Sequence, residues 1–170
     1  MCFTLFKGNG LRVAKMKALD LAKYVILISY QTGYPVSNLQ LQKILYFANM
    51  FYIKKNNKSL IEEHFQAWQF GPVVENVYRE YFSNGSNPIY PTTDLLADAN
   101  FKDGIEKQFK NPIEMKRLIL NLAQMNAWEL VRISHLNDGA WKKTFDEQNP
   151  YLRAEIDEKL IREEMELRFK

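Results

Sequence analysis

Residues 38–55 repeat apolar side chains every three or four positions, and this spacing restricts the fold more than any other feature of the chain. Two neighbouring rows are present, one through Leu41, Leu45, Ala48 and Tyr52 and one through Ile44, Phe47 and Phe51. Residues 17–31 carry a similarly broad apolar face. Side chains at these spacings share one side of an α-helix. We therefore expect two central helices, the second of which packs against neighbours on two sides.

Helix-start and helix-stop signals divide the rest of the chain. Ser37 with Gln40 forms a capping-box pattern, and Pro112 after Asn111 marks another helix start. We expect further helices over residues 72–82, 94–99, 112–124, 127–135 and 152–168, and a loop or short strand near residues 64–70. The fold class is then mainly α, a compact single-domain fold of about six to seven helices with at most that one extended segment.

The length of 170 residues fits a single domain. Residues 1–16 hold three basic residues, no acidic residue and two glycines, and the helical pattern begins only after Met16. We expect an N-terminal extension outside the core over residues 1–16 and one helical domain over residues 17–170. Translation from either Met1 or Met16 agrees with this division.

Cysteine content and hydropathy bear on the compartment. Cys2 is the only cysteine, so no internal disulfide can form and a reducing compartment is favoured. The longest apolar run falls well short of the roughly 20 residues that span a bilayer, and residues 1–16 lack the apolar core of a signal peptide. We expect a cytoplasmic protein without membrane contact.

The net charge of +3 is unevenly distributed. Residues 17–58 hold six lysines and one acidic residue, whereas residues 59–100 hold six acidic residues and one arginine. A nucleic-acid-binding regulator is one interpretation of the lysine-rich stretch. Such proteins usually carry a denser basic stripe, and no helix-turn-helix with a basic second helix is evident, so nucleic acid is a possible but not a favoured partner.

No catalytic or metal-binding motif stands out in the sequence. Glu62, Glu63 and His64 resemble part of a metal site, but adjacent carboxylates on an extended segment point to different sides and leave too few ligands for zinc. His135 has two interpretations, a structural imidazole that packs on Trp141 or a general base paired with His64 or Arg132. We favour the structural role, and expect no enzyme, no metal and no cofactor.

Residues 65–73 concentrate large rings around a Gly-Pro pair. One interpretation is a buried corner, in which Trp68 and Phe70 hold a turn that Gly71 makes possible. The other is a partly exposed aromatic anchor for a protein partner. The residues alone leave both open.

Two blocks of residues, L-Q-K-I-L-Y from Leu41 and A-W-Q-F-G-P-V-V from Ala67, resemble the Panacea domain, the SocA-like antitoxin family that is also labelled phage-associated GepA-like proteins. A weaker third block is His135 with Trp141. The chain departs from the family pattern at Ser134, where threonine is usual, at Ala140, where proline is frequent, and at Phe70, where tyrosine is commoner.

The resemblance implies an antitoxin without catalytic activity, found in phage and prophage genes, that neutralises a toxin encoded by an adjacent gene through direct binding. A protease is a further implied partner, because some members are thought to deliver the bound toxin to one. Lys43 is the position that we most expect to act in binding, as a charge on an apolar helix. The candidate partner-binding positions are Gln42, Lys43, Tyr46, Trp68, Phe70, Gly71, Pro72, Tyr78, His135 and Trp141.

Overall fold

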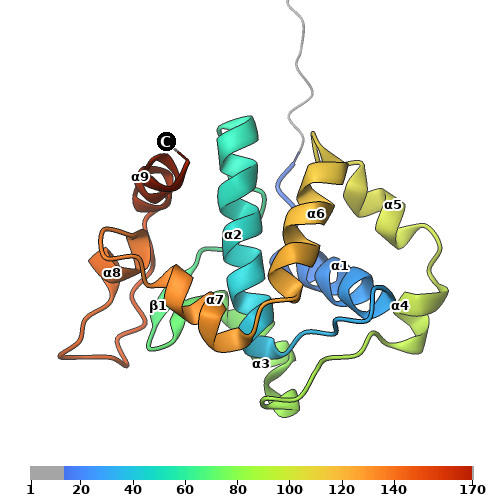
Figure 1. Cartoon of the computed structure of the whole chain (residues 1–170), viewed down its shortest axis with the longest axis horizontal. Helices are drawn as coiled ribbons and strands as arrows, with labels where there is room; N and C mark the ends of the chain where they lie inside the picture. Colours follow the sequence, from blue (N-terminus) through green and yellow to red (C-terminus); the bar gives the residue numbers. More distant parts are fainter. Residues whose placement is uncertain (1–13, 170) are drawn as a thin grey trace, which may run out of the picture.

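A computed structural model describes residues 14–169 and confirms the mainly α fold class (Figure 1). This part of the chain holds nine α-helices, one short 3-10 helix and one two-stranded antiparallel hairpin. In chain order the elements are α1 (Ala18–Gln31), α2 (Asn38–Asn56), β1 (Gln66–Trp68), β2 (Gly71–Val73), α3 (Glu75–Glu80), η1 (Phe82–Asn84), α4 (Thr93–Ala97), α5 (Phe101–Glu106), α6 (Pro112–Ala123), α7 (Ala127–Ser134), α8 (Ala140–Thr144) and α9 (Glu158–Arg168).

Helix α2 is the centre of the fold. It packs against α1, α6, α7, α9 and β2, and Figure 1 shows it between α9 on one side and α1 with α6 on the other. Its apolar rows are buried as the spacing predicts, with Leu41, Ile44 and Leu45 inaccessible to solvent. The capping box is also confirmed, because Ser37 Oγ accepts from Gln40 N and Gln40 Oε1 accepts from Ser37 N at 2.9 Å.

The prediction that a helix over residues 72–82 begins at Pro72 is wrong. Pro72 lies in strand β2, and α3 begins at Glu75 after Val74. The φ angle of proline suits both a first helical turn and an extended strand, so local sequence did not distinguish them. The extended segment is consequently a hairpin that reaches Val73.

Two other boundaries differ from the sequence-based expectation. Met16 is buried in the core, and its backbone bonds to Leu60 O at 2.9 Å and to Glu62 N at 2.9 Å, so residue 16 belongs to the domain rather than to the extension. Helix α9 begins at Glu158, not at residue 152. Cys2 and the choice of Met1 as translation start lie outside the described residues.

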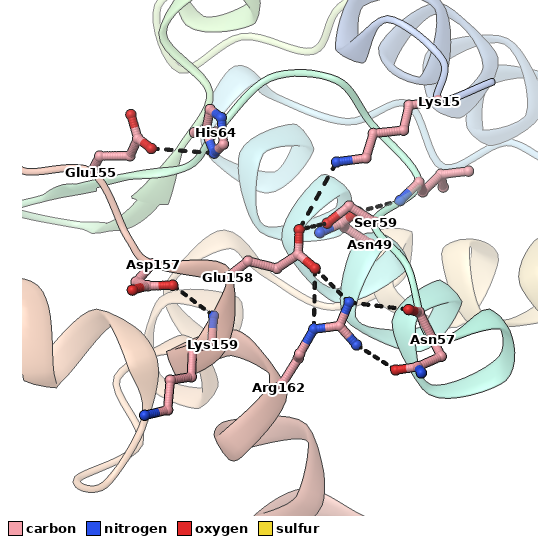
Figure 2. Close-up of polar contacts among 11 residues, drawn as sticks. Lys15, Asn49, Asn57, Ser59, His64, Glu155, Asp157, Glu158, Lys159 and Arg162 are labelled. Carbon is pink, nitrogen blue, oxygen red and sulfur yellow. Dashed lines mark hydrogen bonds and ion pairs between the residues drawn. The ribbon is translucent and has the colours of Figure 1, made fainter.

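The start of α9 is fixed to the loop after α2 by polar contacts (Figure 2). Glu158 accepts from Ser59 Oγ at 2.7 Å and from Arg162 Nε at 3.1 Å. Arg162 also donates to Asn57 Oδ1 at 2.7 Å, and Asn57 adopts the left-handed conformation, φ +55°, that ends α2. These contacts hold the start of α9 against the loop that follows α2.

Within residues 14–169 no helix is long and apolar enough to cross a membrane. In the same part of the chain no three His, Cys, Asp or Glu side chains gather as metal ligands. His64 instead pairs with Glu155, 3.2 Å from Nδ1 to Oε1 (Figure 2).

Candidate partner-binding cleft

The hairpin turn depends on Gly71. Its φ angle is +102°, a conformation that side-chain-bearing residues rarely adopt. A Cβ atom at this position would lie 2.6 Å from Ser134 Oγ and 2.7 Å from Lys43 Cε. Gly71 is therefore required both by the turn and by the close approach of α2 and α7 to the strand.

Two α2 side chains complete the hydrogen bonding of β2. Lys43 Nζ donates to Pro72 O at 2.8 Å, and Gln42 Oε1 accepts from Val74 N at 2.9 Å. Both side chains are buried, so Pro72 O and Val74 N could not form hydrogen bonds with water in their place. The Gln42-Lys43 pair of the first motif thus joins the central helix to the Gly-Pro strand of the second motif.

Lys43, the candidate position most expected to act in binding, is buried in the structure. Its side chain has no solvent exposure, and no carboxylate pairs with it within residues 14–169. Burial lowers the pKa of Lys43 to about 7, because an ammonium group loses its hydration inside a protein. In the sequence, a lysine on an apolar helix resembles a residue that binds a partner protein. Only the tertiary structure shows that Lys43 donates its hydrogen bond to Pro72 O inside the domain.

Tyr46 and Trp141 are also structural. Tyr46 is buried and donates to Glu164 Oε2 at 2.7 Å, and the same oxygen accepts from Ala140 N at 2.8 Å. Trp141 is buried and its Nε1 donates to Trp68 O at 2.7 Å, which fixes the last residue of β1. These bonds attach α8 and α9 to the α2–hairpin unit.

His135 follows the last residue of α7 and stacks on Trp141, with ring centroids 3.6 Å apart and an angle of 5° between the planes. Burial, with the charges of Lys43 and Lys142, lowers its pKa to about 4. Within the described residues Nε2 is buried and has no hydrogen-bond partner. This environment agrees with the structural interpretation, since a general base needs an oriented partner and a pKa near the working pH.

An open cleft of about 450 Å³ lies on the outer side of the hairpin. Three of the candidate positions with aromatic rings line it: Trp68, Phe70 and Tyr78. Phe82 and Tyr151 complete its apolar wall, and both rings are largely exposed, 63% and 82%. The cleft is thus an accessible aromatic surface on a rigid support.

Ring contacts order this wall. Trp68 meets Tyr78 edge-to-face at 4.8 Å, and Tyr78 meets Phe82 in the same way at 5.6 Å. On the other rim, Phe70 meets the exposed Trp128 at 5.4 Å. Residues 65–73 therefore combine a buried turn with accessible rings: Gly71 and Pro72 are buried, whereas Trp68 and Phe70 reach the surface.

The structure separates the ten candidate positions into two groups. Trp68, Phe70, Tyr78 and an edge of Gln42 line the cleft. The other six lie beneath or beside it and hold the hairpin: Lys43, Tyr46, Gly71, Pro72, His135 and Trp141.

The lining residues that were not among the candidate positions include Phe82, Tyr151 and Arg153. A signal was present for Tyr151, a large aromatic residue directly after Asn149-Pro150 and outside the helix expected over residues 152–168. Arg153 has a φ angle of +52°, unusual for arginine, and its guanidinium lies 4.0 Å from the Trp68 ring centroid.

The fold and this cleft define a small helical domain. Its exposed aromatic surface lies beside the buried residues of the two sequence blocks. The chain belongs to the family described as antitoxin SocA-like, Panacea domain, whose model matches residues 41–142. That range contains both sequence blocks and His135 with Trp141.

Among curated proteins, the chain is similar to "Antitoxin SocA" of Caulobacter vibrioides (strain NA1000 / CB15N), with 34% identity over 120 residues. The alignment covers 63% of this chain and 58% of that relative, so the chain spans less than two thirds of the relative's length. No solved structure matches.

Proposed function

We propose that this protein is an antitoxin that neutralises a cognate toxin by direct binding through the aromatic cleft. The observation that carries the proposal is the exposure of Phe70, Phe82 and Tyr151 around one opening, next to an arginine. Tyrosine, tryptophan and arginine are the residues that most often supply binding energy in protein interfaces. Membership of the SocA-like family supports the antitoxin role in particular.

The proposed mechanism is non-catalytic and takes place in the cytoplasm. The cleft covers a face of the toxin that the toxin needs for its own activity, and the toxin gene lies next to the antitoxin gene, as in phage and prophage pairs. Delivery of the bound toxin to a protease is a second step of the proposal. It predicts a shorter half-life of the toxin in cells that contain the antitoxin.

Binding to operator DNA is the alternative function. It was suggested by the lysine-rich stretch over residues 17–58, and the structure weakens that argument. Of the lysines in residues 17–58, Lys43 is buried, Lys55 pairs with Glu114 at 3.0 Å, and Lys54 lies over the Phe169 ring at 4.0 Å. Binding to phosphates needs several exposed cations along one face, and its affinity falls steeply with salt.

Co-expression with the adjacent open reading frame tests the proposal. We expect the protein encoded by the adjacent reading frame to arrest growth of the host when it is expressed alone. Co-expression of this protein should restore growth. The two proteins should also co-purify, at 1:1 stoichiometry or another fixed ratio. Gly71→Ala, which should be destabilised, serves as a control for the dependence of neutralisation on a stable fold. A neighbour that is harmless, or one that arrests growth regardless of this protein and does not co-purify, would contradict the proposal.

A further inference from the structure

Arg153 is the only charged side chain among the described residues that line the aromatic cleft. One face of its guanidinium lies on the Trp68 ring at 4.0 Å, and 45% of its side chain is exposed. A smaller hollow beside the cleft is lined by Trp68, Tyr78, Phe82 and two arginines, Arg79 and Arg153. The charge of the cleft is therefore positive, in a wall that is otherwise apolar or uncharged.

The carboxylate that pairs with Arg153, Glu75, forms only a long ion pair with it and is hydrogen-bonded to other residues. Glu75 Oε1 accepts from Arg79 Nε at 3.0 Å, and Oε2 accepts from Gln66 Nε2 at 3.2 Å. Hydrogen bonds from Arg79 and Gln66 lower the pKa of Glu75, so it remains ionised and engaged. Arg153 Nη1 lies 3.9 Å from Glu75 Oε1, beyond hydrogen-bond distance.

The guanidinium of Arg153 is thus held in place but has free donors. Within residues 14–169 it makes no hydrogen bond, although arginine carries five N–H donors in a planar fork that matches a carboxylate. The contact with Trp68 places the guanidinium over the ring, and its N–H donors make no hydrogen bond within the described residues. The backbone also holds it, because Ala154 O accepts from Ala67 N of β1 at 2.8 Å.

We propose that the cleft selects an acidic segment of the partner protein, in which an Asp or Glu carboxylate pairs with Arg153 while a neighbouring large apolar side chain packs among Phe70, Phe82 and Tyr151. The complementarity of charge favours this occupant: a cation without a hydrogen-bonded carboxylate partner borders an apolar wall whose lining contains no carboxylate. The inference names the partner chemistry of the proposed antitoxin site and rests on that function for its biological meaning.

Two blocked peptides that differ only in charge test the selection. N-acetyl-Gly-Asp-Leu-Phe-Gly-amide and its Asn counterpart are titrated into the ¹⁵N-labelled full chain, and the indole N–H resonance of Trp68 is followed by NMR. We expect the Asp peptide to bind about tenfold or more tightly, since a charge-assisted bidentate pair is lost in the Asn peptide. The preference should shrink in high salt.

The Arg153→Gln variant should bind the two peptides with equal affinity. Arg117 is exposed but does not line the cleft, so the control variant Arg117→Gln should keep the preference for the Asp peptide. Glutamine removes the charge and keeps a polar side chain, and an unchanged Trp141 indole resonance would report an intact hairpin, because Trp141 Nε1 donates to Trp68 O. Equal binding of both peptides to the unmodified protein, no shift at Trp68 with either, or a preference that survives Arg153→Gln would each overturn the proposal.

Co-expression separates this inference from the proposed function. If the unmodified protein neutralises the neighbouring toxin, Arg153→Gln should lose at least about tenfold in affinity for it. Full neutralisation and affinity in Arg153→Gln would refute the acidic-segment inference and leave the antitoxin function standing. Failure of the unmodified protein to neutralise any neighbour would refute the function, while the peptide preference would still report the chemistry of the cleft.

Discussion

Alanine at position 71 is expected to lower the free energy of unfolding by about 3 kcal/mol or more, from backbone strain and overpacking together. The φ angle of +102° is unfavourable for alanine, and the new methyl group would lie 2.6 Å from Ser134 Oγ and 2.7 Å from Lys43 Cε. Neither neighbour can retreat easily, because both side chains are fully buried. Urea denaturation followed by circular dichroism measures the loss.

Gly33→Ala is the matched control for this substitution. Gly33 has a similar φ angle of +85°, but nothing lies within 4 Å of its would-be Cβ atom. Its replacement should therefore cost only the backbone strain, about 1 kcal/mol. Equal losses in the two variants would show that the α2–hairpin–α7 packing around Gly71 is not as tight as described.

The second large effect is on the pH dependence of stability, which Lys43 should dominate between pH 7 and pH 9. Burial lowers its pKa in the folded protein to about 7, whereas an unfolded lysine keeps a pKa of about 10.4. The unfolded state then binds more protons in this range, so stability rises with pH, by about 2 kcal/mol from pH 7 to pH 9. Urea denaturation at both pH values measures the gain.

Lys43→Met should remove most of this gain, since methionine fills a similar volume and does not titrate. His135, the neighbouring imidazole, contributes little in this window because its folded pKa of about 4 and the ordinary value of 6.5 both lie below it. Buried Tyr24 and Tyr46, whose pKa values are raised, lower stability only where unfolded tyrosines ionise, near pH 10 and above. An equal gain in Lys43→Met would contradict the assignment to Lys43.

Local signals in the sequence were sufficient for the main helices. The apolar rows of α2, its capping box at Ser37, and the Asn111-Pro112 start of α6 each act within a few residues, and the structure has all three. The hairpin was not predictable in the same way. Pro72 fits a helix start as well as a strand, and the choice depends on Lys43 and Gln42, which bond to β2 from about 30 residues earlier in the chain.

The cleft was predictable only in part for the same reason. Trp68, Phe70 and Tyr78 are close in sequence to the Gly-Pro turn, so a motif locates them. Arg153 lies beside Trp68 because the segment before α9 pairs with β1, where Ile156 N donates to Phe65 O at 2.7 Å. No periodicity marks such a pairing. The burial of Lys43 was likewise not evident from the sequence, because its inward hydrogen bond to Pro72 O depends on the hairpin packing against α2.

Co-purification of the toxin with the double variant Phe82→Ser/Tyr151→Ser tests most directly whether the cleft binds the partner. Both side chains are largely exposed, so the fold should tolerate the change, and Ile113→Ser/Tyr34→Ser replaces exposed residues that do not line the cleft. We expect the cleft variant to lose about tenfold or more of its affinity for the toxin and the control to lose none. If the cleft variant retained the toxin as well as the unmodified protein does, binding would have to take place elsewhere on the domain.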